Sequence, residues 1–135
     1  MVEKEVVTSF LLCKGRILIL RRSESVGTYR GKWAGVSGYV EDSVDKQAFI
    51  EIEEETGLSE DDVQLIRKGR PLEVHDQGIG VKWVVHPYLF RVRDPGKIRI
   101  DWEHKQAKWI RPEEINRYET VPKLKEVLQR VYERI

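Results

Sequence analysis

The chain has 135 residues, enough for one domain with a buried core and too few for two domains of ordinary size. Its 24 lysines and arginines nearly balance its 23 aspartates and glutamates, and the formal net charge is +1. This balance argues against a dedicated nucleic-acid binder and against a membrane-surface protein. No apolar run is long enough to cross a bilayer, and the charged N-terminus is unlike a secretory signal.

The cysteine content and the charge content bear on the cellular setting. Cys13 is the single cysteine, so no internal disulfide can form, and we expect a cytoplasmic protein in a reducing compartment. Charged residues make up 35% of the chain, a usage that occurs in thermophile proteins. Charge-rich mesophile proteins share it, and of the two we favour a thermophile source.

The first half of the chain alternates β-rich segments with turns and ends in a helix. Residues 6–12 and 16–20 are apolar runs separated by Lys14-Gly15, which predicts a hairpin. A glycine-rich loop over 27–35 leads into a short strand at 36–40. Residues 44–56 have helical periodicity and stop at Gly57, a favourable C-terminal cap.

The second half contains further short strands and a C-terminal helix. We expect strands at 63–66, 79–92, 98–102 and 107–110, a turn at 94–96, and a brief helix opened by Pro112. The last helix starts near Thr120 and Pro122. Its apolar stripe serves either the core or a homodimer interface, and comprises Leu124, Val127, Leu128, Val131 and Ile135. These elements predict one α+β domain over residues 1–135, with helices packed on a mixed sheet.

The most informative segment is the acidic end of the first predicted helix. At about 100° per residue, Glu51, Glu54 and Glu55 fall within one arc of that helix. Like charges at these spacings cost ~0.2–0.5 kcal/mol per pair, and carboxylates in a last turn oppose the helix dipole. A divalent cation with oxygen ligands, Mg²⁺ or Mn²⁺, would relieve the repulsion. The alternative is a solvated acidic face.

The flanking sequence favours the metal site, because it resembles the Nudix hydrolase family. The second half of the Nudix box is matched in register by Glu51, Ile52, Glu54, Glu55, Gly57 and Leu58. Residues 33–41 resemble the strand and glycine turn before the box, and residues 102–115 resemble the family's late strand and short helix. Residues 21–38 and 119–122 look like the Nudix-type domains joined to initiation-factor-2B-like proteins. The resemblance covers nearly the whole chain.

The resemblance implies an α/β/α sandwich with a mixed sheet and a metal-dependent pyrophosphohydrolase. Its metal ligands would be Glu51, Glu54 and Glu55, and its cofactor Mg²⁺ or Mn²⁺. Glu54, Glu55 or Glu103 would take the proton from the attacking water, and the choice among them stays open. The partner would be a small-molecule nucleotide, such as ADP-ribose, a dinucleoside polyphosphate or a nucleoside triphosphate.

Several residues near the glycine-rich loop are candidates for substrate binding. Among the cations Arg21, Arg22, Arg30 and Lys32, we select Arg22 and Arg30 as candidates for binding substrate phosphates. Trp33 and Gly38 are further candidates for substrate binding. Trp33 and Trp83 could stack on a base or belong to the core. The segment 74–77 is a further substrate-contact candidate, expected to be a loop. The three histidines, His75, His86 and His104, lack a metal-ligand spacing and are interpreted as structural or surface residues.

The sequence also departs from the family pattern. Ile50 stands where the family has an arginine, and the loop between Gly38 and Ile50 is two residues short. The arginine is understood to pair with an upstream glutamate and brace the loop, and packing of Ile50 is our expected replacement. A Nudix-like binding module without catalysis is therefore the alternative function. An RNA-end hydrolase would use the same chemistry but would want a more basic surface.

Overall fold

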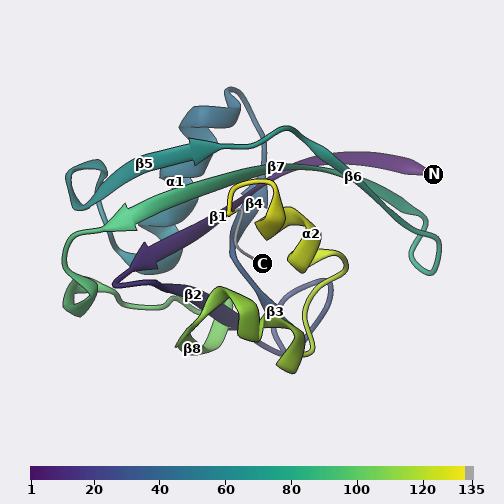
Figure 1. The fold of residues 1–135 in the computed structure, drawn as a ribbon. Helices are drawn as coiled ribbons and strands as arrows, with labels where there is room; N and C mark the ends of the chain where they lie inside the picture. The colour runs from purple at the N-terminus through teal and green to yellow at the C-terminus, as the bar shows by residue number, and fades with distance from the viewer. Residues whose placement is uncertain (133–135) are drawn as a thin grey trace.

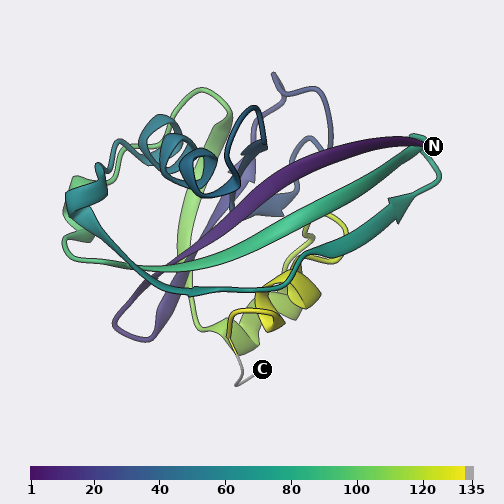
Figure 2. The same cartoon turned by 90° about the horizontal axis from the view of Figure 1, so that it is seen from above.

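The computed structural model describes residues 1–132 and shows a mixed sheet between two helices (Figure 1). The strands of the sheet are β1 (Val2–Cys13), β2 (Arg16–Arg22), β3 (Trp33–Ala34), β4 (Val36–Tyr39), β5 (Val63–Lys68), β6 (Leu72–Asp76), β7 (Val81–Val92) and β8 (His104–Ile110). The central strands β1 and β7 pair in parallel, and the other pairs described are antiparallel. The helices α1 (Val44–Thr56) and α2 (Leu124–Gln129) lie on opposite sides of the sheet (Figure 2). The predicted α+β sandwich is confirmed.

Two hydrophobic cores form because side chains alternate along each strand. On β1, Val7 and Leu11 belong to the core that includes Ala48 and Ile52 of α1. The intervening Phe10 belongs to the core under α2. Strands buried on both faces explain the near-continuous apolar runs in the sequence.

The helix α1 has the predicted bounds because both of its ends are capped. The Ser43 hydroxyl accepts a hydrogen bond from the Lys46 amide at the N-terminus. Gly57 adopts a left-handed conformation with φ 76° and donates its amide to the Glu53 carbonyl. Packing of Ala48 and Ile52 in the core sets the rotation of the helix, and with it the direction of its acidic face.

The predicted strand at 98–102 is wrong. Residues 98–100 have no regular secondary structure, and the late strand β8 begins only at His104. The Arg99 amide donates to the Thr56 carbonyl at 2.8 Å, so the backbone of this segment bonds to the end of α1 instead of to a strand. Ile98 and Ile100 pack against the core under α1, which accounts for their apolar character.

The segment expected to be a loop at 74–77 is mostly a strand. Residues up to Asp76 belong to β6, which pairs with β7, and the turn between them follows Asp76. The apolar signal is weak here because β6 is at an edge of the sheet and most of its side chains are partly or fully exposed. The strand nevertheless pairs Val74 with Trp83, and both of these residues line the cavity described below.

The C-terminal helix begins at Leu124, later than predicted, and its apolar stripe lies in the core. Leu124, Val127, Leu128 and Val131 are all at most 2% exposed. The stripe therefore packs within the chain and is not available as a dimer interface. Ile135, the last residue of the predicted stripe, lies outside the described residues.

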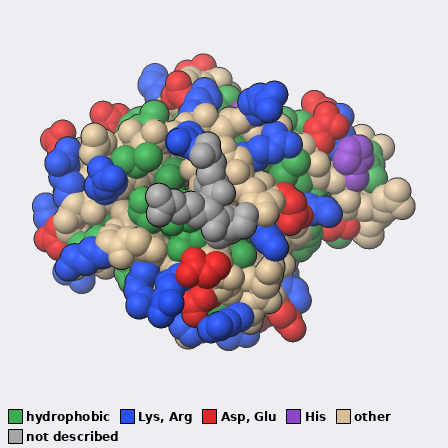
Figure 3. Space-filling view, in the orientation of Figure 1, with side chains coloured by type: hydrophobic (Ala, Val, Ile, Leu, Met, Phe, Trp, Pro, Cys, Tyr) green, Lys and Arg blue, Asp and Glu red, His purple; other side chains and the backbone are tan. Residues whose placement is uncertain are grey.

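The surface carries both signs of charge. On the face seen in Figure 3, lysine and arginine side chains are interspersed with acidic ones. Over residues 1–132, no helix is both long enough and apolar enough to span a membrane.

Candidate active site

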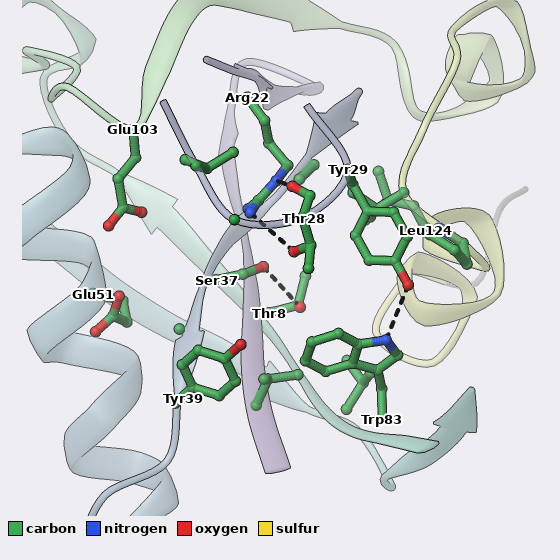
Figure 4. A pocket seen from close by; sticks show the side chains of 18 of the residues that line it. Thr8, Arg22, Thr28, Tyr29, Ser37, Tyr39, Glu51, Trp83, Glu103 and Leu124 are labelled. Atoms are coloured by element: carbon green, nitrogen blue, oxygen red, sulfur yellow. Dashed lines mark hydrogen bonds between the residues drawn. The ribbon is translucent and has the colours of Figure 1, made fainter. Parts of the chain in front are cut away.

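A cavity of about 470 Å³ extends from the acidic face of α1 to the underside of α2 (Figure 4). Its α1 end is acidic and is lined by Glu41, Glu51 and Glu103. Its other end, the aromatic end, is lined by Tyr29, Tyr39 and Trp83, and Arg22 lies between the two ends. The volume lies in the range of small-molecule sites.

Gly38 is required because the Glu51 side chain lies directly over it. A Cβ atom at position 38 would fall 2.1 Å from Cδ and 2.1 Å from Oε1 of Glu51. Any side chain at position 38 would therefore force the Glu51 carboxylate out of its position. Gly38 of β4 therefore lets a carboxylate from α1 reach the cavity wall, where Glu51 is only 8% exposed.

Gln47 holds Glu51 in place and braces the short loop after β4. Its amide Nε2 donates to Glu51 Oε2 at 2.8 Å, and its Oε1 accepts from the Glu41 amide at 3.3 Å. The prediction that Ile50 replaces the arginine brace by packing is wrong, because the Ile50 side chain points outward and is 42% exposed. Gln47 stands one turn before Glu51, a spacing that could have identified it from the sequence.

Glu55 lies deeper than Glu51 and is almost fully enclosed. It is 1% exposed, and neither of its carboxylate oxygens accepts a hydrogen bond from a donor among the described residues. Burial, followed by a shared-proton hydrogen bond with the Glu51 carboxyl and by the charge of Glu51, raises the pKa of Glu55 well above its usual value. A buried carboxylate without donors is costly, so this group calls for an external cation or a proton.

His104 contacts Glu55 from the start of β8. Its Nε2 lies 3.4 Å from Glu55 Oε1, and its Nδ1 lies 3.1 Å from Asp101 Oδ1. Because an ionised carboxylate only accepts, Nδ1 donates to Asp101. Burial lowers the pKa of His104, so Nε2 is left as a bare acceptor facing Glu55. No spacing in the sequence pointed to this contact.

Glu54 and Glu103 flank the two buried glutamates. Glu54 is exposed, although its charge contributes to raising the pKa of both Glu51 and Glu103. Glu103 lines the cavity, and burial followed by the charge of Asp101 raises its pKa. The predicted acidic arc therefore divides into a buried pair, Glu51 and Glu55, and a solvent-facing Glu54, while Glu103 joins Glu51 at the acidic end of the cavity from the segment before β8.

The donor set fits a divalent cation. Among residues 1–132, no three acidic, histidine or cysteine side chains converge closely enough to form a complete cage. Mg²⁺ does not need one, since it usually keeps several waters and binds through one or two carboxylates plus substrate phosphates. The orphaned oxygens of Glu55 beside the half-satisfied Glu51 supply such a pair of hard ligands.

Arg22 is held in the cavity by the glycine-rich loop. Its Nε donates to the Thr28 carbonyl at 2.9 Å, and its Nη2 contacts the Thr28 hydroxyl at 3.4 Å. Its charge acts on both Glu103 and Tyr29, which places it between the two ends of the site. A phosphate bridging the two ends would meet this guanidinium.

Two of the predicted substrate residues lie elsewhere. Arg30 is exposed, donates its Nε to the Val26 carbonyl, and does not line the cavity. Trp33 is buried against Tyr118, with ring centroids 5.5 Å apart, and belongs to the core under α2. Of the two tryptophans considered, Trp83 is the one that lines the cavity.

A sheet sandwiched between helices in this arrangement is also found in known proteins. A model of the NUDIX domain family matches residues 4–131. A MutT protein from Methanosarcina mazei Go1 is similar in structure, with a TM-score of 0.79, 24% identity and coverage of 96% of this chain and 92% of that one. An Ap4A hydrolase from C. elegans gives a TM-score of 0.74 at 17% identity, covering 96% of this chain and 94% of that one.

The E. coli dihydroneopterin triphosphate pyrophosphohydrolase gives a TM-score of 0.75 at 16% identity over 100% of both chains. No curated protein matches the chain. Since the family model spans nearly the whole sequence, the chain belongs to the NUDIX domain family. This membership confirms the enzyme class expected from the sequence, a Nudix-type pyrophosphohydrolase.

Proposed function

We propose that the protein hydrolyses a phosphoanhydride bond in a nucleoside-diphosphate-linked small molecule, with Mg²⁺ or Mn²⁺ as cofactor. The observation that carries this proposal is the buried carboxylate pair, Glu51 and Glu55, at the acidic end of a cavity that also presents Arg22. The pair is costly as it stands and matches the ligand preference of those cations. Three similar structures are named as a MutT protein, an Ap4A hydrolase and a triphosphate pyrophosphohydrolase.

The proposed metal ligands are Glu51 and Glu55, with Glu54 approaching from the solvent side. When bound, the cation would neutralise phosphate charge and lower the pKa of a bound water. Gln47 keeps the Glu51 carboxylate at the cavity wall through the 2.8 Å bond, and Gly38 leaves the space it occupies. Glu55 is enclosed behind it, so a ligand role suits Glu55 better than direct contact with substrate.

Glu103 is the proposed general base. It lines the acidic end of the cavity together with Glu51, whereas Glu55 does not line the cavity and Glu54 is exposed to solvent. In the hydrolysis, the water oxygen bonds to phosphorus, the bond from phosphorus to the bridging oxygen breaks, and Glu103 takes the proton of the water. Its raised pKa brings this carboxylate closer to the range of an effective base near neutral pH.

A substrate panel with matched variants tests the proposal. The panel comprises ADP-ribose, diadenosine tetraphosphate, ADP-glucose and the nucleoside triphosphates, each with Mg²⁺, Mn²⁺ or EDTA. Glu51→Gln removes a proposed ligand, whereas Glu53→Gln changes an exposed glutamate on the same helix and serves as control. We expect metal-dependent turnover that Glu51→Gln abolishes and Glu53→Gln retains. Nucleotide binding without turnover on the whole panel would instead indicate a non-catalytic binding module.

A further inference from the structure

The end of the cavity far from the carboxylates is built almost entirely from rings and aliphatic side chains. Its lining comprises Tyr29, Tyr39, Trp83, Val74, Val85, Leu124 and Val127. Tyr39 and Trp83 lie with ring centroids 6.2 Å apart and planes inclined by 29°. The Lys4 ammonium lies 5.5 Å from the centre of the Tyr39 ring and 6.0 Å from that of Trp83.

The polar atoms of this aromatic end are already paired with one another. The Trp83 indole N–H donates to the Tyr29 hydroxyl at 3.1 Å, and that hydroxyl donates to Asp76 Oδ2 at 2.6 Å. Burial raises the pKa of Tyr29 to about 12, which keeps the hydroxyl a donor at neutral pH. Neither group therefore has a free donor to offer the edge of a ligand.

Tyr29 is also held in an unusual backbone conformation. Its φ of 49° is in the left-handed region that residues other than glycine rarely adopt. The side chain ties the glycine-rich loop to β6 through Asp76 and to β7 through Trp83. Strain of this kind persists where the surroundings fix it and is concentrated at functional sites.

The hydroxyl groups that remain along the cavity do not discriminate between donors and acceptors. Thr8 and Ser37 pair with each other at 2.9 Å. The hydroxyls of Tyr39 and Ser25 can rotate to donate or to accept, and the Thr28 hydroxyl, which accepts from Arg22, can also rotate. These side chains can therefore pair equally well with a base edge that carries hydrogen-bond donors and with one that carries acceptors.

We propose that this aromatic end binds the base of the nucleotide by ring stacking and apolar contact, and that it accepts purine and pyrimidine bases alike. The inference rests on the proposed function, since it takes the diphosphate to lie between Arg22 and the carboxylates. Stacking tolerates any base, because every base has a π-face. A site that hydrogen-bonds the edge of a substrate lowers kcat/KM by about 10⁴–10⁵ for an analogue that lacks the bonding group. An apolar pocket distinguishes similar substrates by only about 10–200-fold in kcat/KM.

Calorimetric titration of the full chain with ADP, GDP, CDP and UDP in Mg²⁺ tests the inference. We expect four dissociation constants within about tenfold of one another. Tyr39→Ala should weaken all four by a similar factor of about 5–100. Tyr39 is 51% exposed, so its truncation leaves the core intact. Tyr39→Phe, which keeps the ring, should lie closer to the unaltered protein, and Leu65→Ala on the exposed β5 is the control.

A preference of more than a hundredfold for one base would overturn the inference, as would unchanged affinities in Tyr39→Ala or the absence of binding by all four nucleotides. Turnover of ADP-, GDP-, CDP- and UDP-glucose is measured separately. Tolerant binding without turnover would support this inference and reject the proposed hydrolysis. Turnover restricted to a single base would support the hydrolysis and reject this inference.

Discussion

Replacing the buried Glu55 by glutamine should stabilise the metal-free protein while removing its response to metal. The carboxylate is 1% exposed and neither of its oxygens accepts a hydrogen bond from a donor within the described residues. Leaving a charged group in that state costs about 1–3 kcal/mol or more. Glutamine has the same shape without the charge, and its amide can donate to the Nε2 of His104, 3.4 Å from Glu55 Oε1. We expect Glu55→Gln to raise the free energy of unfolding by about 1–3 kcal/mol at pH 7 in EDTA.

The pH dependence follows from the direction of the pKa shift. Burial raises the pKa of Glu55 in the folded protein above the value of 4.5 expected for the unfolded chain. A raised pKa means that the folded state binds this proton more tightly, so the stability it contributes is complete below pH 4.5. That contribution is lost as the pH rises through the folded pKa. The stability difference between Glu55→Gln and the unaltered protein should therefore grow from pH 4.5 to pH 7.

Urea unfolding followed by circular dichroism measures both effects. Samples in EDTA across this pH range give the intrinsic stabilities, and samples with MgCl₂ give the stabilisation by metal. Glu53→Gln, which removes an exposed glutamate from the same helix, should match the unaltered protein throughout. A Glu55→Gln protein less stable than the unaltered one in EDTA at pH 7 would refute the reasoning. So would a variant that MgCl₂ still stabilises fully.

Three further substitutions test the geometry around the carboxylates. Gly38→Ala places a Cβ 2.1 Å from Glu51 Cδ, so the Glu51 carboxylate must move away and turnover should be lost, while the free energy of unfolding changes little; a fully active variant would contradict the close approach. Gln47→Ala should weaken metal affinity by about 10–100-fold in Mg²⁺ titrations of turnover, and unchanged affinity would argue against the brace. Ile50→Arg should change the free energy of unfolding by less than about 0.5 kcal/mol, because the side chain is 42% exposed; a larger loss would show that Ile50 packs after all.

The elements that the sequence predicted well are those determined by local signals. The helix 44–56 had apolar periodicity and a glycine at its end, and its bounds agree with α1. The strand predicted at 98–102 was wrong because the alternation of Ile98, Ile100 and Trp102 does not show which element the backbone of this segment bonds to. The Arg99 amide is bonded to Thr56, which lies in another element. Strand β6 was missed for the related reason that its pairing with β7 leaves most of its side chains partly or fully exposed.

Within the candidate site, spacing identified the carboxylates but not their environments. Helical geometry predicted that Glu51, Glu54 and Glu55 share an arc, yet only packing decides that Glu54 is the exposed one. Similarly, Arg22 and Arg30 are both cations near the glycine-rich loop. Only the contacts with Thr28 turn Arg22 into the cavity, whereas Arg30 bonds to its own loop. Such distinctions depend on contacts between residues in different elements or in irregular loop geometry, which no periodicity encodes.

The brace by Gln47 connects the unusual sequence of this chain with its proposed metal requirement. An arginine at position 50 would have brought a positive charge beside the acidic helix, but Ile50 brings none and points outward. Gln47 orients Glu51 through a neutral amide and links it to Glu41 of the shortened loop. Among the described residues, this brace adds no positive charge beside Glu51 and Glu55. A cation from solution would balance the buried pair, so the proposed metal requirement does not depend on an arginine at position 50.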